Sequence, residues 1–280
     1  LEGDVARIGR EVIAVSVPRL VEIDMTADDD AVWGYGLGCN GAIELFVEPT
    51  GGALESVAAL RSGQGSCLVI LLTGADVGLH LLETDGAAAA ALHDRTARVE
   101  EVDGERLYYE PLVPPLRLLV GGAGHDAIPL VRQAAELGWQ VLVVDVRKAL
   151  LTSERFPGAG EFASPDPEAA GDALAADERT AAILMSHNYL RDIAYLRSFL
   201  DRPLAYLGVL GPRGRTEQML AQLGRPEAMD RLHAPAGLDI GAEGPEEVAH
   251  AIIGEILAVA RRRQGGPLRD RRAPIHEERR

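Results

Sequence analysis

The chain has 280 residues, of which 47% are hydrophobic, and its formal net charge is −15 at pH 7. This length and composition allow two domains with buried cores. The acidic balance argues against nucleic-acid binding, because phosphate backbones would be repelled, and no apolar run approaches the length of a membrane span.

Two cysteines, Cys39 and Cys67, stand far apart and show no metal-binding spacing. This usage is typical of a reducing compartment, so we expect a cytoplasmic protein without disulfides or a metal site. Lys148 is the single lysine, so the chain has neither the G-K-[S/T] of a P-loop nor a Tyr-x-x-x-Lys dehydrogenase dyad.

Residues 1–115 are predicted to form a smaller α+β domain. Apolar residues at helical spacing predict a helix over Glu2–Val15, and Asp103-Gly104 is a β-hairpin signal. Strands are expected over residues 20–25, 43–47, 68–72, 77–82, 99–102 and 106–109. The prolines at 111, 114 and 115 predict a stiff connection, and we place the domain boundary there.

Four glycines surround Cys39 in the segment Trp33–Gly41. Glycine at these positions leaves the backbone open to a ligand or to another strand. Cys39 is therefore either a buried small residue or a reactive thiol, whereas Cys67, in the run CLVILL, is expected in a core. The acidic run 28–30 is predicted to be a solvated turn, the alternative being a cation site.

A strand, glycine turn, helix and second strand are predicted over Leu116–Asp145. Gly122 and Gly124 with Ala127 match G-x-G-x-x-G/A, the turn of dinucleotide-binding folds. The following helix start offers unpaired N–H groups to an anion, and Asp145 stands where an acid commonly bonds a ribose hydroxyl. The pattern predicts an α/β fold with a doubly wound, mostly parallel Rossmann-like sheet over residues 116–264.

The remaining elements continue this alternation. Strands are expected over residues 161–163, 181–185 and 205–210, and helices over 166–176, 189–200, up to Leu223 with Thr216 as its cap, and from Pro245 to about Arg263. The tail, residues 265–280, is predicted to be disordered because it mixes glycine, proline and charges.

Three loops should carry polar groups to the carboxyl edge of this sheet, where open α/β sheets bind ligands. They hold the residues Gly122, Gly124 and His125; Ser186, His187 and Asn188; and Arg213 and Arg215. Each histidine could instead make one ordinary loop hydrogen bond, and the two arginines could pair with surface acids.

Taken together, these motifs resemble the xanthine dehydrogenase accessory family, XdhC/CoxI. The resemblance covers roughly residues 1–260 and rests on the segments LEGDVAR, WGYGLGCNGAIELFVEP, VGGAGHDAIPLV, LMSHN, YLGVLGPR and APAGLDIGAEGPEEVA. The chain begins where a family segment with a preceding cysteine would end, so we expect a fragment or a processed chain.

The resemblance implies a chaperone of the molybdenum cofactor rather than an enzyme. Such a protein holds molybdopterin cofactor while a cysteine desulfurase installs sulfur, then delivers it to apo xanthine dehydrogenase or a related molybdenum hydroxylase. Cofactor contacts would come from Cys39, Gly122, Gly124, His125, Asp145, Ser186, His187, Arg213 and Arg215.

Two other functions remain open from the residues alone. The glycine turn and Asp145 also fit an NAD(P)-dependent oxidoreductase with His187 as acid or base. A regulatory module that holds a nucleotide without chemistry fits as well. Exposed strand edges predicted for the first domain are compatible with a homodimer.

Overall fold

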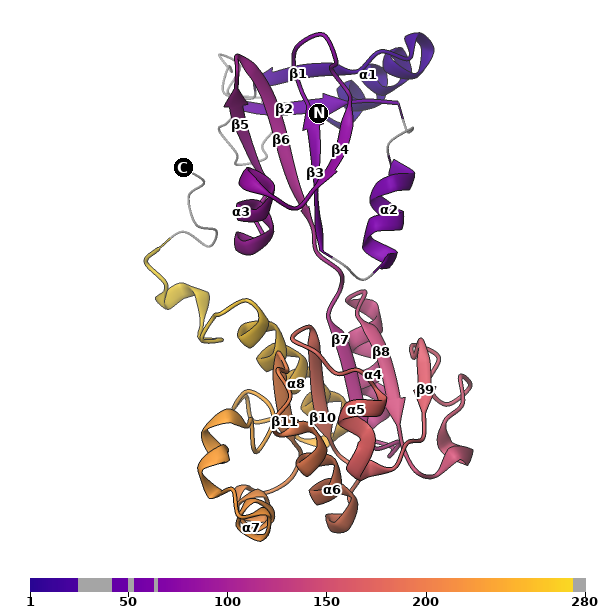
Figure 1. Cartoon of the computed structure of the whole chain (residues 1–280), viewed down its shortest axis with the longest axis vertical. Coiled ribbons are helices and arrows are strands. Elements are labelled where there is room, and N and C mark those ends of the chain that lie inside the picture. Colours follow the sequence, from indigo (N-terminus) through magenta and orange to yellow (C-terminus); the bar gives the residue numbers. More distant parts are fainter. Residues whose placement is uncertain (25–41, 50–52, 63–64, 274–280) are drawn as a thin grey trace, which may run out of the picture. The chain divides into compact units, whose positions relative to one another are not determined.

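The computed structural model describes residues 1–24, 42–49, 53–62 and 65–273 (Figure 1). The chain divides into two compact units between Pro114 and Pro115. Among the described residues, no helix is long and apolar enough to cross a bilayer. Cys39, the rest of the Trp33–Gly41 segment and the acidic run 28–30 lie outside the described residues.

The first unit is built on a four-stranded antiparallel sheet of order β4-β3-β6-β5. Its strands are β3 (Ser66–Leu71), β4 (His80–Glu83), β5 (Arg98–Val102) and β6 (Glu105–Leu112), and a separate ribbon pairs β1 (Arg19–Asp24) with β2 (Ala42–Val47). Asp103 and Gly104 both have positive φ, 53° and 82°, as a two-residue hairpin turn of the predicted kind requires.

Three helices belong to this unit: α1 (Glu2–Val15), α2 (Ala53–Ser62) and α3 (Gly86–Asp94). Ala88 and Ala91 of α3 pack against Cys67 and Val69, and Cys67 is fully buried. The opposite face of the sheet packs against residues of β1, β2 and α2. The expected helix 2–15 and the core position of Cys67 are present, whereas α2 and α3 were not expected from the sequence.

The second unit contains a five-stranded parallel sheet of order β11-β10-β7-β8-β9. The strands are β7 (Arg117–Gly121), β8 (Gln140–Val144), β9 (Glu161–Ala163), β10 (Thr180–Leu184) and β11 (Tyr206–Val209). Leu118, Val120 and Val143 face one helical layer, while Leu119, Leu142 and Val144 face the other. Burial on both faces explains the continuous apolar runs, and the predicted α/β Rossmann fold is confirmed.

Helices cover both faces of this sheet (Figure 1). The helices α4 (Ala127–Glu136) and α8 (Gly244–Ala260) pack on one face, and α5 (Ala170–Ala173), α6 (Tyr189–Phe199) and α7 (Arg213–Leu223) lie on the other. Short 3-10 helices occur at Lys148–Leu150, Pro167–Ala169, Pro226–Arg231 and Leu268–Asp270.

Two local expectations about helices are wrong. The helix predicted over 166–176 is a 3-10 turn followed by the single helical turn of α5; there a Cβ on Gly171 would lie 2.1 Å from the Ser198 carbonyl oxygen. Thr216 does not cap α7, because the helix begins at Arg213 after Pro212 and Thr216 is buried within it.

Candidate functional site

The strand order places a topological switch point between β7 and β10. From β7 the chain moves outward through β8 and β9, and it then returns to β10 on the other side of β7. In open α/β sheets the loops at such a point diverge and leave a crevice at the carboxyl edge. The two loops concerned are residues 121–126 and 185–188, which contain most of the predicted site residues.

Gly122 forms the turn after β7, with φ of 138°, and its N–H donates to the carbonyl of Val144 at 2.8 Å. A Cβ at this position would lie 2.6 Å from the Met185 carbonyl oxygen and 2.7 Å from Ser186 Cα. Glycine is therefore required here because the backbone of the β10 loop passes against it. The side of Gly122 on which a Cβ would lie therefore faces protein.

Asp126 and His187 meet across the switch point. Asp126 lies at the start of α4, and its Oδ2 is 2.6 Å from Nε2 of His187, which follows β10. A Cβ on Gly124 would lie 2.5 Å from Oδ1 of Asp126 and 3.6 Å from Cδ2 of His187. The side chain of His187 remains 61% exposed, so the pair lies at the protein surface.

Asp145 is buried beneath the glycine turn. Its Oδ2 accepts hydrogen bonds from the N–H of Ala123 and from Nη2 of Arg147, while Oδ1 accepts from the N–H and Nε of Arg147, all between 2.7 and 2.9 Å. These four bonds occupy the acceptor sites of a carboxylate. Asp145 therefore anchors the turn, and these protein donors take the acceptor sites that the predicted bond to a ribose hydroxyl would use.

The same contacts lower the pKa of this carboxyl. Burial alone raises the pKa of Asp145, but the hydrogen bonds from Arg147 and Ala123 outweigh it and lower the pKa to about 2. The lowered pKa means that Asp145 stabilises the folded state fully above its unfolded-state value of about 4, and that this contribution disappears as the pH falls through about 2.

We expect Asp145→Asn to lower the free energy of unfolding by about 2 kcal/mol at pH 7, because an amide cannot accept all four bonds. The difference from the parent chain should shrink as the pH falls from about 4 to about 2, as measured by urea unfolding. Glu161→Gln on the neighbouring β9, where the carboxylate is 70% exposed, serves as the control and should cost less than about 0.5 kcal/mol. A difference that stayed constant with pH would contradict the assigned role.

A second buried carboxylate, Asp192 of α6, connects the loops that follow β10 and β11. Its Oδ1 accepts from the N–H and Oγ of Ser186, at 3.1 and 2.6 Å, and its Oδ2 accepts from Nη2 of Arg215 at 2.7 Å. The Arg215 guanidinium also lies 5.7 Å from the centre of the Tyr189 ring. Ser186 and Arg215 are thus brought together as predicted, but through a carboxylate that we did not single out.

The remaining predicted residues differ in their exposure and in their hydrogen-bond or ion-pair partners. His125 is exposed, and within the described chain no hydrogen bond to its ring occurs. Arg213 is 65% exposed and pairs with Glu217 of its own helix at 2.9 Å. Leu190, in the first turn of α6, adds an apolar side chain that is 72% exposed. These side chains form an exposed rim on which a ligand could make contacts.

Three important residues were missed in the sequence: Asp126, Arg147 and Asp192. Asp126 lies inside the glycine motif, so its negative charge at an expected anion site was a visible signal. Asp192 precedes Tyr195 and Leu196 by three and four residues, and therefore falls on the same buried side of α6. Arg147 offered no comparable signal in the sequence.

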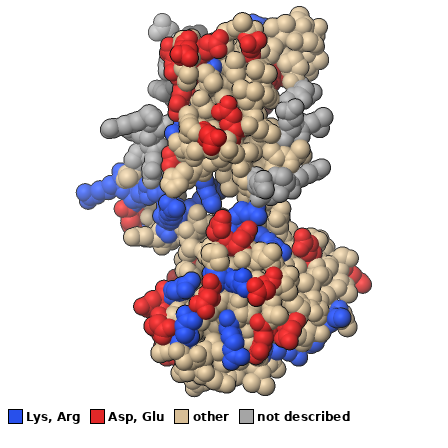
Figure 2. Space-filling model, viewed as in Figure 1, with Lys and Arg blue, Asp and Glu red and all other residues tan. Residues whose placement is uncertain are grey.

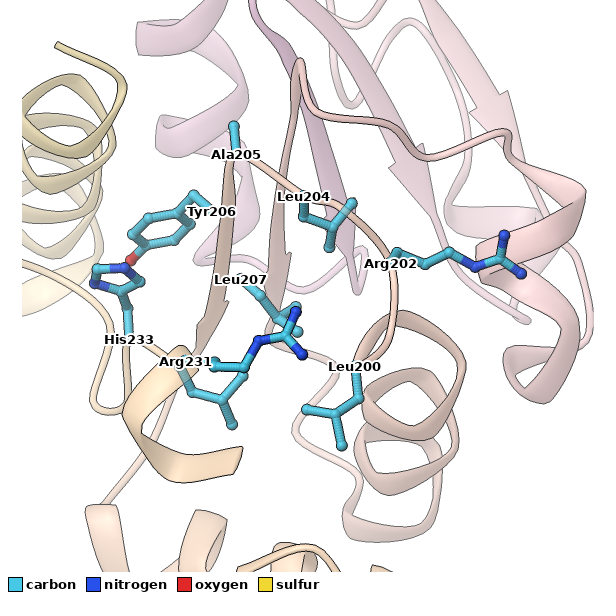
Figure 3. A pocket seen from close by; sticks show the side chains of 9 residues that line it. Leu200, Arg202, Leu204, Ala205, Tyr206, Leu207, Arg231 and His233 are labelled. Atoms are coloured by element: carbon cyan, nitrogen blue, oxygen red, sulfur yellow. The ribbon is translucent and has the colours of Figure 1, made fainter. Parts of the chain in front are cut away.

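A separate hollow of about 230 Å³ lies beside the start of β11 (Figure 3). Leu200, Leu207 and Arg231 lie on one side of the strand, while Tyr206 and His233 point toward each other on the other side. The hydroxyl of Tyr206 donates to Glu255, which His233 also contacts. This hollow lies at the amino end of β11 and is therefore distinct from the switch point.

Charge is unevenly divided between the two units. Residues 1–114 carry most of the excess of acidic over basic side chains, while residues 115–280 are close to balanced. Figure 2 shows acidic and basic groups interspersed on the visible face of the Rossmann unit. An anionic ligand therefore meets little net repulsion from the unit that carries the switch point.

The fold and the switch point define a Rossmann-type protein whose carboxyl sheet edge carries exposed histidine and arginine side chains. Residues 118–256 match the family model of the XdhC Rossmann domain. Over 257 residues the chain is 32% identical to a probable xanthine dehydrogenase subunit of Bacillus subtilis, covering 87% of this chain and 77% of that protein. The chain belongs to the XdhC family.

The chain is also similar to a second sequence relative and to a solved structure. Over 155 residues the chain is 34% identical to the uncharacterized protein YqeB of Escherichia coli, covering 54% of this chain and 28% of that protein. The crystal structure of a xanthine dehydrogenase from Bacillus halodurans superposes with a TM-score of 0.75 and 26% identity, covering 95% of this chain and 83% of that one. The fold of both units therefore has an experimental counterpart.

Proposed function

We propose that this protein is an accessory factor of a xanthine dehydrogenase or a related molybdenum hydroxylase, and that it holds molybdopterin cofactor before handing it to the apo-enzyme. Family membership supports the association, since two of the compared proteins are named as a xanthine dehydrogenase or as a subunit of one. The observation that carries the proposal is the switch point between β7 and β10, where exposed polar groups surround a glycine turn.

The residues at this edge fit the phosphate end of such a cofactor. The rim offers hydrogen-bond donors from His125 and His187, and the N-terminus of α4 favours negative charge. Gly124 leaves a place beside the turn once the Asp126 side chain moves, whereas Gly122 is closed by the β10 loop. We therefore assign the contacts to the rim and to Gly124 rather than to Gly122 or Asp145.

The buried carboxylates act on the ligand only by holding the loops. Asp145 fixes the turn at Ala123, and Asp192 fixes Ser186 and Arg215. When bound, the molybdenum cofactor supplies the redox chemistry of the hydroxylase that receives it. The chain itself binds, orients and shields the cofactor. Cys39 remains a proposed cofactor contact and lies outside the described residues. A cysteine desulfurase is the second proposed partner, and a homodimer is the proposed assembly.

A nucleotide-dependent oxidoreductase is less well supported by the geometry. That function rested on Asp145 as the ribose contact, and all four acceptor sites of this carboxylate are occupied within the protein. The proposal thus favours a ligand that is recognised by its phosphate and by contacts on the rim.

Anaerobic mass spectrometry of the intact protein tests the proposal. We expect molybdopterin to remain bound at one equivalent per chain after incubation and desalting, and we expect the loaded protein to restore activity to an apo-hydroxylase. Retention of NAD(P) with carbonyl turnover, or failure to retain molybdopterin under anaerobic conditions, would reject the cofactor-holding function.

A further inference from the structure

The carboxylate of Asp126 occupies the place that a phosphate needs. In a dinucleotide-binding turn, the second glycine of the motif lets the diphosphate approach the backbone. That glycine is Gly124, and a Cβ added to it would lie 2.5 Å from Oδ1 of Asp126. The space that the missing side chain opens is therefore filled by a negatively charged group of the chain itself.

His187 holds this carboxylate from the loop after β10. The 2.6 Å contact between Oδ2 of Asp126 and Nε2 of His187 joins the loop after β7 to the loop after β10. His187 has a φ of 55°, in the left-handed region, which is uncommon for a residue with a side chain. This uncommon backbone conformation therefore occurs at the residue that contacts Asp126.

Asp126 does not serve the usual purpose of an acid at a helix start. It is the residue that precedes α4, yet its side chain accepts no hydrogen bond from the N–H groups of the first turn. Asn188, in the equivalent position before α6, does accept one, from the N–H of Arg191 at 3.0 Å. The Asp126 carboxylate instead leans over Gly124 and contacts His187, where it would repel an arriving phosphate.

We propose that Asp126 is a specificity-determining residue that excludes free nucleotides and diphosphates from the Rossmann turn. A phosphate reaches Gly124 only when the Asp126 side chain rotates away and releases His187, which then faces the phosphate. A ligand whose other parts contact the rim can offset this displacement, whereas a ligand held by its phosphates alone cannot. This inference rests on the proposed function, and it adds how the site distinguishes the proposed cofactor from free nucleotides.

Calorimetric titration with ADP, a nucleoside diphosphate, tests the inference on three proteins: the parent chain, Asp126→Asn and Glu136→Gln. Asparagine keeps the size of the side chain but removes its charge, and we expect ADP to bind about tenfold more tightly than to the parent. Glu136 is the last residue of the same helix α4, so Glu136→Gln makes the same change in net charge far from the turn. It should bind ADP as the parent does.

A further variant distinguishes two causes of tighter ADP binding: removal of the repelling charge and a general loosening of the turn. In the Asp126→Asn background, adding His187→Ala should lower ADP affinity again, because the released imidazole faces the phosphate. Equal or weaker ADP binding by Asp126→Asn, or no ADP binding by either protein at millimolar concentration, would overturn the inference. Thermal unfolding of each variant checks that the turn remains folded.

Molybdopterin titrations keep this inference distinct from the proposed function. Tighter ADP binding by Asp126→Asn without molybdopterin retention by any variant would support the exclusion and reject the cofactor-holding function. Molybdopterin retention by the parent, with unchanged ADP affinity in Asp126→Asn, would support the function and reject Asp126 as its specificity determinant.

Discussion

Gly122→Ala is expected to destabilise the Rossmann unit by about 4 kcal/mol, the sum of backbone strain and a steric clash. The φ of 138° is accessible to glycine and strained for alanine, and the new Cβ would meet the Met185 and Ser186 backbone at 2.6 to 2.7 Å. Because backbone atoms cannot rotate away, the β7 and β10 loops must separate. Urea unfolding followed by Trp139 fluorescence in a Trp33→Phe background measures the loss within this unit.

Gly138→Ala provides the matched control for this clash. Gly138 also has a positive φ, 75°, but no atom lies within 4 Å of the place where its Cβ would be. Its substitution should therefore cost only the strain of the left-handed conformation, about 1 to 2 kcal/mol. Equal losses for Gly122→Ala and Gly138→Ala would show that the contact with the β10 loop does not require glycine.

Asp192→Asn is expected to lower the free energy of unfolding by about 3 kcal/mol, because removing one charge of a buried ion pair leaves the other charge without its partner. Asp192 is 1% exposed and accepts from Ser186 and Arg215, so asparagine would turn amide hydrogens toward one of these donors. The loops after β10 and β11 would then lose their common anchor. Molybdopterin retention should fall together with stability.

The exposed pair of Asp201 with Arg225 supplies the comparison for Asp192. It joins the same two residue types at 3.0 Å, but its carboxylate is 70% exposed. Asp201→Asn should therefore leave the free energy of unfolding nearly unchanged, and cofactor retention should also be unchanged. A small loss for Asp192→Asn in the same unfolding experiment would mean that the loops hold their places without this carboxylate.

The sheet of the Rossmann unit was predictable from the sequence because its strands are buried on both faces. The apolar runs at 116–120, 141–144 and 181–185 each form a strand within one residue of these bounds, and Gly138, with a φ of 75°, follows the end of α4. In the first unit, α3 was missed because its run of alanines has no polar face to mark a helical period. High helix propensity of alanine was the available signal.

The site was harder to predict because residues distant in sequence decide whether the glycine turn is open or filled by protein atoms. The pattern of Gly122, Gly124 and Asp145 is the same whether a turn holds a ligand or contacts protein. Met185 and Ser186 close the space over Gly122, and Asp126 with His187 closes the space over Gly124. Periodicity places these loops at one edge of the sheet, but it does not reveal which side chains fill the turn.

Hydrogen–deuterium exchange of the parent protein, with and without molybdopterin, tests most directly whether the switch point holds the ligand. We expect slower amide exchange in residues 121–126 and 185–189 on loading, while exchange in β11 and around the hollow beside it remains unchanged. Protection confined to the first unit, with both of these loops exchanging as in the free protein, would contradict this expectation.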